Sequence, residues 1–451
     1  MPVPSSNKPI STSRSVWRLA WPTIISNLLF TTVGFMQIKI VAELGTSSVA
    51  AVTTGQRIFF LVQALLMGVS VATTALIARS WGARDVRKAE LVSWTSLAMS
   101  VVLAAVVSIP VVLAPGALAG LFGLDAETTA LAASYIFWLG LFNVFAAVNM
   151  MLGTVLRATG DVMTPLWFLL FSSVLNVLFA YLLAFGVGPV PQYGVGGVAL
   201  GSSAGAALVT TAFFIAWWRG LFNLKPPRPL SVDRGMIRQI TSIGGPAVLE
   251  QGIVQVAFLV FFAIVAHFGT VAYAAYGIGI TLVAFPIVIG FGFGIATATL
   301  VGQQLGAGQI ELAVLAVTRS LRMCLVAMVL LSILLAWFAE DLARFMIKDP
   351  EAIHLTVVFM YIIALAQPFM AFEFTLGGAL RGAGDTRFPL IATLCGIFLG
   401  RLIPASIFLL LGLSVYWIFA VMLSDYVIKA VLLLHRFRSR KWLEVKLGAA
   451  N

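Results

Sequence analysis

The sequence predicts an all-α integral membrane protein with twelve transmembrane helices, arranged as two parallel six-helix repeats. Three observations predict this fold: an apolar composition, twelve long apolar runs, and an internal repeat at a fixed offset. Of the 451 residues, 61% are hydrophobic and 10% are charged, and the mean hydropathy is +1.03. A soluble domain carries charge at roughly a quarter of its positions. The composition therefore excludes soluble enzymes, nucleic-acid-binding proteins and disordered scaffolds.

The apolar runs define the helices in order along the chain. A spanning helix needs about 20 mostly apolar residues, and these runs are apolar on every face, unlike the alternating strands of a β-barrel. The first run follows a polar tail and continues as a full span, so we expect no cleaved signal peptide. The predicted spans are centred near Thr31, Gln63, Val102, Phe142, Leu175, Ala207, Ala257, Pro286, Met328, Ala366, Phe398 and Val421.

The basic residues give the orientation. Most of the 28 Lys and Arg residues fall in loops on one side, whereas the opposite side has only Arg344 and Lys348. Cytoplasmic loops carry the excess of Lys and Arg. The formal charge of +11 therefore reflects membrane topology, and an even number of spans places both termini in the cytoplasm.

An internal repeat appears at a constant offset of 224 residues. Leu156-Arg157-Ala158-Thr159-Gly160-Asp161 matches Leu380-Arg381-Gly382-Ala383-Gly384-Asp385, and Pro165 matches Pro389. Arg, Asp and Pro at one fixed offset indicate a true duplication. Six helices in each copy make the repeats parallel, as in transporters that rock one half against the other.

The repeat sets the expected domain boundaries. The linker holds Lys225-Pro226-Pro227-Arg228-Pro229, whose prolines favour an extended strap. No GxxxxGK[ST] motif occurs, so we expect no nucleotide site and no ATP hydrolysis. The predicted parts are a cytoplasmic N-terminal tail (1–15), an N-lobe (16–219), the cytoplasmic linker (220–236), a C-lobe (237–436) and a cytoplasmic C-terminal tail (437–451).

Taken together and in register, these motifs resemble the multidrug and toxic compound extrusion (MATE) family over residues 16–436. The resemblance implies a V-shaped, two-lobed, twelve-helix exporter of the bacterial inner membrane that exchanges protons or sodium ions for bulky organic compounds. The motifs are the doubled Leu-Arg-x-x-Gly-Asp block, the early prolines Pro22 and Pro246, the exits Leu44-Gly45-Thr46 and Phe268-Gly269-Thr270, and the turns Gly82-Ala83 and Gly306-Ala307.

The predicted N-lobe site departs from the family pattern. Where many relatives have an Asp near the end of the first helix, this chain has Gln37, and the family's helix-five Asn and Asp appear as Asn176 and Ala180. With Ser202, Gln37 and Asn176 predict a neutral polar pocket that cannot release a proton.

Two basic residues lie near this pocket in the sequence. Lys39 is a functional candidate because an ionisable group at membrane depth is costly, or it reaches the periplasmic surface and water. Arg57 either pairs with Glu43 or lines the substrate cavity.

The predicted C-lobe holds the membrane-embedded acids Glu250, Glu373 and Asp425. Some family branches have acids on the same two helices as Glu250 and Glu373, each one helical turn away, so the resemblance suggests a displaced ion-coupling pair. The alternatives are structural roles. Glu373 caps or forms a salt bridge with Arg381 near the cytoplasmic surface, and Glu250 lies among the first turns of its helix and has no coupling role. Asp425 has Lys429 at i+4 and Arg401 on the preceding helix, which favours a neutralised ion network over a coupling role.

Aromatic and methionine side chains present adaptable surfaces to flat ligands. The residues that we expect to line the substrate cavity are Phe35, Met36, Arg57, Phe142, Met150, Phe258 and Arg401.

The sequence predicts neither a metal site nor a disulfide framework. No His or Cys spacing is typical of metal ligands, and the two cysteines lie inside apolar runs.

The sequence thus predicts a monomeric multi-pass antiporter, not an enzyme, that exports drugs or other xenobiotics. It needs no cofactor beyond the coupling ion. Protons are favoured over sodium ions because the N-lobe acids are absent. Lys39, Arg57 and Arg401 support an alternative, an exporter of an anionic metabolite or siderophore-like product. A lipid-linked sugar flippase of the same broader superfamily is a further alternative, which the count of twelve helices disfavours.

Overall fold

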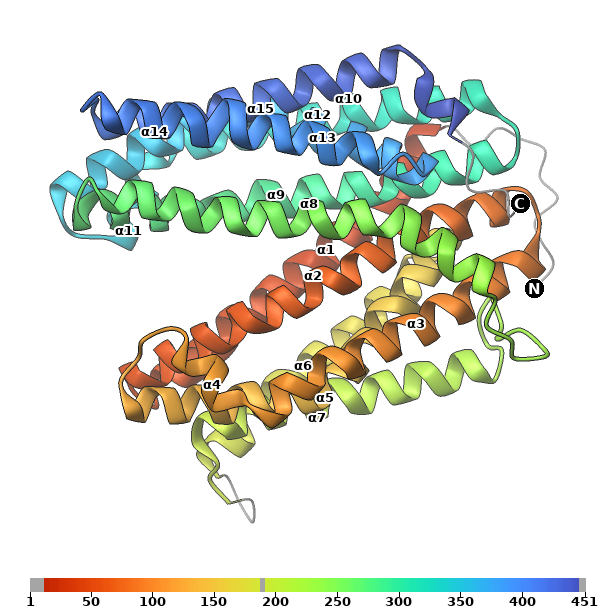
Figure 1. Ribbon diagram of the computed structural model, residues 1–451, viewed down its shortest axis with the longest axis horizontal. Helices are drawn as coiled ribbons and strands as arrows, with labels where there is room; N and C mark the ends of the chain where they lie inside the picture. The colour runs from red at the N-terminus through yellow and green to blue at the C-terminus, as the bar shows by residue number, and fades with distance from the viewer. Residues whose placement is uncertain (1–11, 187–190, 446–451) are drawn as a thin grey trace. The chain divides into compact units, whose positions relative to one another are not determined.

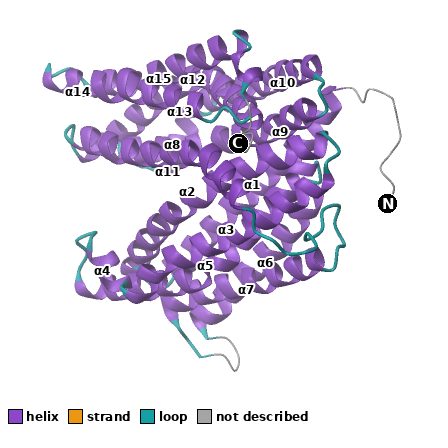
Figure 2. Cartoon of the chain, turned by 45° about the vertical axis from the view of Figure 1, so that its right-hand side comes forward, coloured by secondary structure: helices purple, strands orange, loops and turns teal. Residues whose placement is uncertain are grey.

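The computed structural model describes residues 12–186 and 191–445, and these residues contain helices and turns but no strand (Figure 2). Most of the predicted N-terminal tail and the end of the C-terminal tail lie outside this range. The first half contains α1 (Thr12–Ala42), α2 (Thr46–Gly82), α3 (Val86–Leu113), α4 (Pro115–Gly120), α5 (Ala126–Thr159), α6 (Met163–Phe185) and α7 (Gly194–Trp218) (Figure 1). The second half contains α8 (Arg234–Ala266), α9 (Thr270–Gly306), α10 (Ile310–Trp337), α11 (Ala339–Met346), α12 (Pro350–Ala383), α13 (Arg387–Cys395), η1 (Gly396–Leu402), α14 (Ile403–Leu410), α15 (Val415–Arg438) and η2 (Lys441–Glu444).

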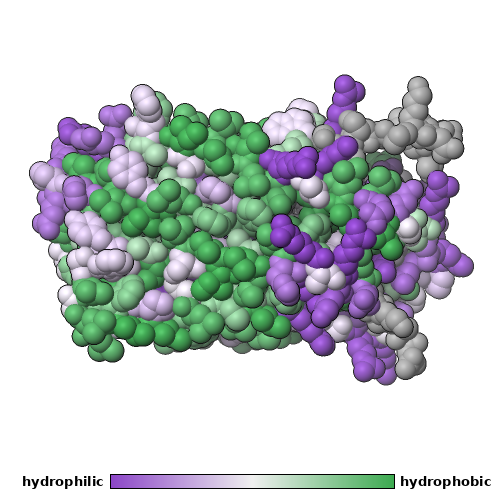
Figure 3. All heavy atoms as spheres, turned by 90° about the horizontal axis from the view of Figure 1, so that it is seen from above, coloured by the Kyte–Doolittle hydropathy of each residue, from purple (hydrophilic) through white to green (hydrophobic). Residues whose placement is uncertain are grey.

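Twelve of the described helices are long and apolar enough to span a membrane, which confirms the predicted number. α13, η1 and α14 together form one of them, Arg387–Leu410, whereas α4 and α11 are short connecting helices. On the face shown in Figure 3, hydrophobic side chains cover a broad middle region, and strongly hydrophilic ones gather at the end drawn on the right. This division fits a bilayer with a basic cytoplasmic side.

The duplication is present in the helices themselves. α2 and α9 begin and end 224 residues apart, and so do α3 and α10, and α5 and α12. α2 and α9 each have 37 residues. At about 1.5 Å per residue such a helix is longer than the roughly 30 Å hydrocarbon layer, so part of each helix extends beyond it.

The described residues form two compact units. The N-unit is Ile25–Gly252, and the C-unit takes the chain up to Ile24 and from Ile253 onward. The division falls inside α1 and α8, because the first part of α1 packs in the C-unit and the first part of α8 packs in the N-unit. Gly68 of α2 contacts Val248 of α8 in the N-unit, and Gly292 of α9 contacts Ile24 of α1 in the C-unit. These two contacts occupy equivalent positions of the repeat.

The repeated Leu-Arg-x-x-Gly-Asp block forms a helix end and the start of the next helix. Gly160 adopts φ 95° after α5, and the Asp161 amide donates to the carbonyl of Leu156 at 3.0 Å. This is the left-handed cap for which glycine is suited. The Asp161 carboxylate accepts from the Thr164 amide at 3.1 Å and so caps α6.

The second copy repeats this turn with one addition. Gly384 adopts φ 92° after α12, and the Asp385 amide donates to Leu380 at 2.8 Å. The Asp385 carboxylate accepts from Phe388 at 3.4 Å and forms an ion pair with Arg436 of α15 at 2.9 Å. The turn therefore also holds α15 in the C-unit.

Glycine allows α6 and α7 to pack closely in the N-unit. A Cβ atom at Gly205 would lie 2.8 Å from the carbonyl oxygen of Leu175 and 2.9 Å from the amide nitrogen of Asn176. Small residues at such contacts let membrane helices approach each other. This contact holds α7 against the residues around Asn176.

We expect Gly205→Ala to destabilise the N-unit, because the new methyl group meets backbone atoms that cannot rotate away. Overpacking of this kind costs roughly 1–3 kcal/mol. Gly34→Ala is the matched control: it also lies in a long helix, but a Cβ there has nothing within 4 Å. Thermal unfolding of the purified protein, followed by tryptophan fluorescence, should show a lower Tm for Gly205→Ala only. Equal melting of both variants would contradict the role given to this contact.

Candidate functional site

The N-unit contains a cluster of neutral polar side chains contributed by four helices. Gln37 of α1 donates to the Asn176 side chain of α6 at 2.9 Å, and Asn176 donates to the carbonyl oxygen of Ser202 in α7 at 3.2 Å. Gln56 of α2 and Tyr135 of α5 each donate to the Gln37 oxygen at 3.5 Å. The structure therefore brings together Gln37, Asn176 and Ser202, which the sequence predicted as one site.

Two members of this cluster were missed by sequence reasoning. Gln56 is an amide inside an apolar span, a signal that was visible beside Arg57. Tyr135 carried no such signal, because an aromatic residue in a membrane helix usually faces lipid or a neighbouring helix. The four side chains in the hydrogen bonds are amides and a phenol, so the cluster holds no carboxylate for proton exchange.

Lys39 and Arg57 are exposed and lie beside this cluster in sequence. Within the described part of the chain, no ion pair joins either of them to Glu43. The structure therefore does not show the first of the two alternatives for Arg57, its pairing with Glu43, and its place in the cavity stays a prediction. Phe35 and Met36 are also exposed, at 49% and 44%. The C-terminal part of α1 therefore exposes an aromatic ring, a thioether and an ammonium group.

The C-unit contains a network of four charged side chains. Asp425 of α15 forms ion pairs with Arg401 of η1 and, at 3.1 Å, with Lys429 one turn further along α15. Lys429 also contacts Glu373 of α12 at 3.3 Å. The predicted contacts of Asp425 with Lys429 and Arg401 are confirmed. Glu373 belongs to the same network, a contact that the sequence did not predict.

The four members differ in exposure. The side chains of Asp425, Arg401 and Lys429 are 0%, 5% and 5% exposed, whereas that of Glu373 is 21% exposed. A buried ion is stable only when partners surround it. Asp425, Arg401 and Lys429 therefore form a closed centre, and Glu373 is the most exposed member at its edge, with the Oε2 atom of its carboxylate buried.

Glycines make room for this network between η1 and α15. A Cβ at Gly396 would lie 2.6 Å from Cγ of Lys429, and one at Gly400 would lie 2.8 Å from Cα of Asp425. η1 is a π-helical segment, which is often found where a helix carries a functional side chain. The hydroxyl of Ser424 donates to the Gly400 carbonyl and so satisfies one backbone acceptor of the segment.

Aromatic rings surround the two cations. The Arg401 guanidinium lies 5.9 Å from the ring centroid of Phe258 and 5.8 Å from those of Phe261 and Tyr426. The Lys429 ammonium lies 5.3 Å from the ring of Tyr426. Cation–π contacts of this geometry stabilise desolvated cations. Phe258 and Arg401, both expected to line the cavity, are thus neighbours in the C-unit.

The other predicted residues lie elsewhere. Glu250 is 6% exposed and belongs to the N-unit, so its pairing with Glu373 of the C-unit stays a prediction. Phe142 packs against Phe145, and Met150 packs beside Ala147. Their role in a cavity also stays a prediction.

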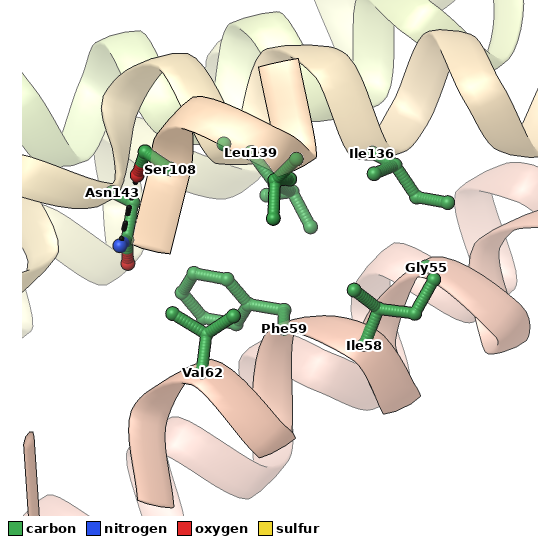
Figure 4. A pocket seen from close by; sticks show the side chains of 10 residues that line it. Gly55, Ile58, Phe59, Val62, Ser108, Ile136, Leu139 and Asn143 are labelled. Atoms are coloured by element: carbon green, nitrogen blue, oxygen red, sulfur yellow. Dashed lines mark hydrogen bonds between the residues drawn. The ribbon is translucent and has the colours of Figure 1, made fainter. Parts of the chain in front are cut away.

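A small cavity separates α2 from α5 in the N-unit (Figure 4). Apolar side chains line most of it, and Asn143 donates to the Ser108 hydroxyl at 3.1 Å along one side. The cavity is too small for an organic substrate. Among the described residues, no group of three or more His, Cys, Asp or Glu side chains is placed to hold a metal ion.

Comparisons with known proteins agree with this fold. The MatE family profile matches residues 22–182 and 246–407, one segment in each repeat. A probable multidrug resistance protein, NorM of Thermotoga maritima, is 27% identical over 436 residues, which cover 94% of this chain and 92% of NorM. A FAD transporter of Shewanella oneidensis is 23% identical over 388 residues, 86% of each chain. A solved MOP-superfamily transporter of Pyrococcus furiosus has the same fold, with a TM-score of 0.88, 21% identity, and coverage of 96% of this chain and 97% of that one.

We expect Asp425→Asn to destabilise the protein strongly, because it leaves Arg401 and Lys429 buried without their shared counter-ion. Breaking a buried pair in this way costs about 3–5 kcal/mol. Glu340→Gln is the control, since Glu340 also pairs with a cation four residues on, Arg344, but both side chains are more than 60% exposed. Its loss should stay within about 1 kcal/mol. Thermal melting of the two variants in the same detergent compares them, and similar losses would argue against a closed charged centre.

Proposed function

Because the chain belongs to the MATE family of transporters, we propose that it is a secondary active exporter that exchanges protons for organic compounds. It is a multi-pass protein of the bacterial inner membrane and a transporter, not an enzyme. The proposal concerns the coupling ion, the class of cargo and the residues that couple them. Drugs and other xenobiotics are the proposed cargo, and a monomer is the proposed working form.

The observation that carries the proton assignment is the accessible edge of the C-unit network. Glu373 combines a carboxylate, a position in a membrane span and 21% exposure, and its partner Lys429 is almost fully buried. A group that couples proton movement to transport must be accessible to water in at least one state of the transport cycle. It must also interact electrostatically with the charged groups around it. Of the four network members, Glu373 best meets both requirements.

The network also supplies a reason for proton uptake to change the conformation. When Glu373 takes a proton, its attraction to Lys429 disappears, and Lys429 remains paired with Asp425 alone. The contact between α12 and α15 loses one ionic link, while the contact between η1 and α15 is kept. Release of the proton restores the link. A change in the ionic contact between α12 and α15 is suited to moving these two helices relative to each other.

Glu250 is the second proposed coupling group. It is buried within a spanning helix, α8, and an ionisable residue in such a place is a functional candidate. The neutral cluster around Gln37 and Asn176 is proposed to bind polar groups of the cargo through amides. It takes no part in proton exchange.

Everted vesicles with a preset pH gradient test the coupling. Adding cationic dyes should trigger proton release for the wild type, and Glu373→Gln should lower this release to the background of empty vesicles. Glu250→Gln should reduce it as well. Glu311→Gln is the control because Glu311 is 75% exposed and, among the described residues, forms an ion pair only with Arg440. Release that persists in Glu373→Gln, with expression matched, would contradict coupling at Glu373.

A second candidate function is export of organic anions. The observation that favours it is the exposure of two cations, Lys39 of α1 and Arg57 of α2, together with the exposure of Phe35, which lies one helical turn before Lys39. A flat anion would find both a ring to stack on and a positive charge. The Shewanella oneidensis relative, a FAD transporter, belongs to the same range of similarity as the multidrug relatives.

Lys39→Gln and Arg57→Gln separate the two candidates. If the cargo is anionic, each change removes one attraction and should raise the apparent KM for a fluorescent aromatic anion about 3- to 10-fold, equivalent to about 1 kcal/mol. Transport of cationic dyes should stay the same or improve. Lys88→Gln, at an exposed position in the first turn of α3, is the control. Unchanged anion transport in both variants would leave the cationic cargo as the better assignment.

A further inference from the structure

Lys429 occupies the position that a bound metal cation would need in the C-unit. Its ammonium lies 3.1 Å from Asp425 Oδ1 and 3.3 Å from Glu373 Oε1. We propose that Lys429 is a built-in cation that prevents sodium binding between these two carboxylates and so restricts coupling to protons. This inference rests on the proposed coupling role of Glu373 and adds the residue that selects the ion.

The charge balance of the site is the first argument. Arg401 and Lys429 contribute two positive charges, and Asp425 and Glu373 contribute two negative charges, so the charges of these four side chains cancel. A sodium ion would add an unbalanced positive charge to a centre in which three of the four side chains are at most 5% exposed. An unbalanced buried charge is strongly unfavourable.

The ligands of the site are the second argument. Alkali cations are bound by several oxygen atoms that replace their hydration shell. Here Asp425 Oδ2 faces Arg401, and Asp425 Oδ1 and Glu373 Oε1 face Lys429. Sodium would have to displace the Lys429 ammonium before it could bridge the Asp425 and Glu373 carboxylates through these atoms.

A proton on Glu373 adds the same single positive charge as a sodium ion, so charge balance alone does not separate the two ions. The requirement for ligands separates them. A proton binds to one carboxylate oxygen of Glu373, forms an O–H bond and needs no coordination shell. The ammonium of Lys429 keeps its contact with Asp425, and no ligand has to be vacated. The same lysine therefore opposes sodium far more than it opposes protonation.

The neighbours of Lys429 support its role as a fixed cation. Asp425 and Tyr426 come from α15, Arg401 from η1 and Glu373 from α12, and Tyr276 of α9 faces Arg401 and Tyr426. Two of these groups, Asp425 and Glu373, are carboxylates that pair with the Lys429 ammonium. The ring centroid of Tyr426 lies 5.3 Å from that ammonium. Arg401 is the sole cation among them and is itself paired with Asp425.

Removing the lysine charge should create a sodium site. In Lys429→Met the network carries one net negative charge, and two carboxylates are left to gather a cation. We expect the full-length protein in detergent to melt at a Tm higher by a few degrees in NaCl than in KCl or choline chloride of equal ionic strength, with a saturable dependence on sodium. Wild-type protein should melt at the same Tm in all three salts.

The double variant Lys429→Met with Glu373→Gln is the matched control. It restores a neutral network but lacks one carboxylate, so the sodium-specific rise should vanish. A sodium-specific rise in the wild type would overturn the proposal, and so would its absence in a folded Lys429→Met protein. If Lys429→Met does not fold, the wild-type titration still tests the proposal, because exclusion of sodium predicts no specific response.

These outcomes are separate from those of the transport assay. Loss of the proposed proton exchange would show as missing proton release in vesicles, whatever the melting temperatures are. Conversely, sodium-specific stabilisation of the wild type would overturn the selecting role of Lys429 even where proton release is intact.

Discussion

The pairing of Asp425 with two cations is the constraint on which the C-unit depends. A carboxylate that is 0% exposed inside a membrane span cannot remain charged unless cations contact it. Arg401 and Lys429 supply that contact from two different segments, so η1 and α15 must stay together. The glycines at positions 396 and 400 follow from this need, because any side chain there would separate the segments.

Both repeats contain a pair of closely packed helices, but the glycines that allow the close approach lie on different members of the pair in the two repeats. In the N-unit the glycines lie on α7, where Gly201 and Gly205 face the backbone of α6. The equivalent positions in the C-unit are Asp425 and Lys429, and the glycines have moved to the partner segment η1. One duplicated frame therefore holds a neutral amide cluster in one copy and a charged network in the other. The close approach of the helices is retained in both.

The fold was largely predictable because its signals are local or periodic. Span length, the asymmetry of Lys and Arg, and the fixed offset of 224 residues need no knowledge of side-chain contacts. The Asp425–Lys429 pair was predictable for the same reason, since i and i+4 share a helix face. The contact of Lys429 with Glu373 was not, because it joins α15 to α12 and depends on how far each helix rotates. The π-helical segment η1 and the membership of Gln56 and Tyr135 in the N-unit cluster also depend on tertiary packing.

The difference between the two copies bears on how one protein couples two events. A neutral amide cluster can bind polar cargo at any pH, because its hydrogen bonds do not depend on a titrating group. A charged network responds to a single proton, because each ion pair in low dielectric contributes strongly and its loss is not screened by water. In the proposed exchange, these two kinds of site in different copies of the repeat let cargo binding and ion binding act on different helices. An exchange of cargo for ions then requires a link between the two units, and α1 and α8, each of which has parts in both units, are continuous helices that provide one.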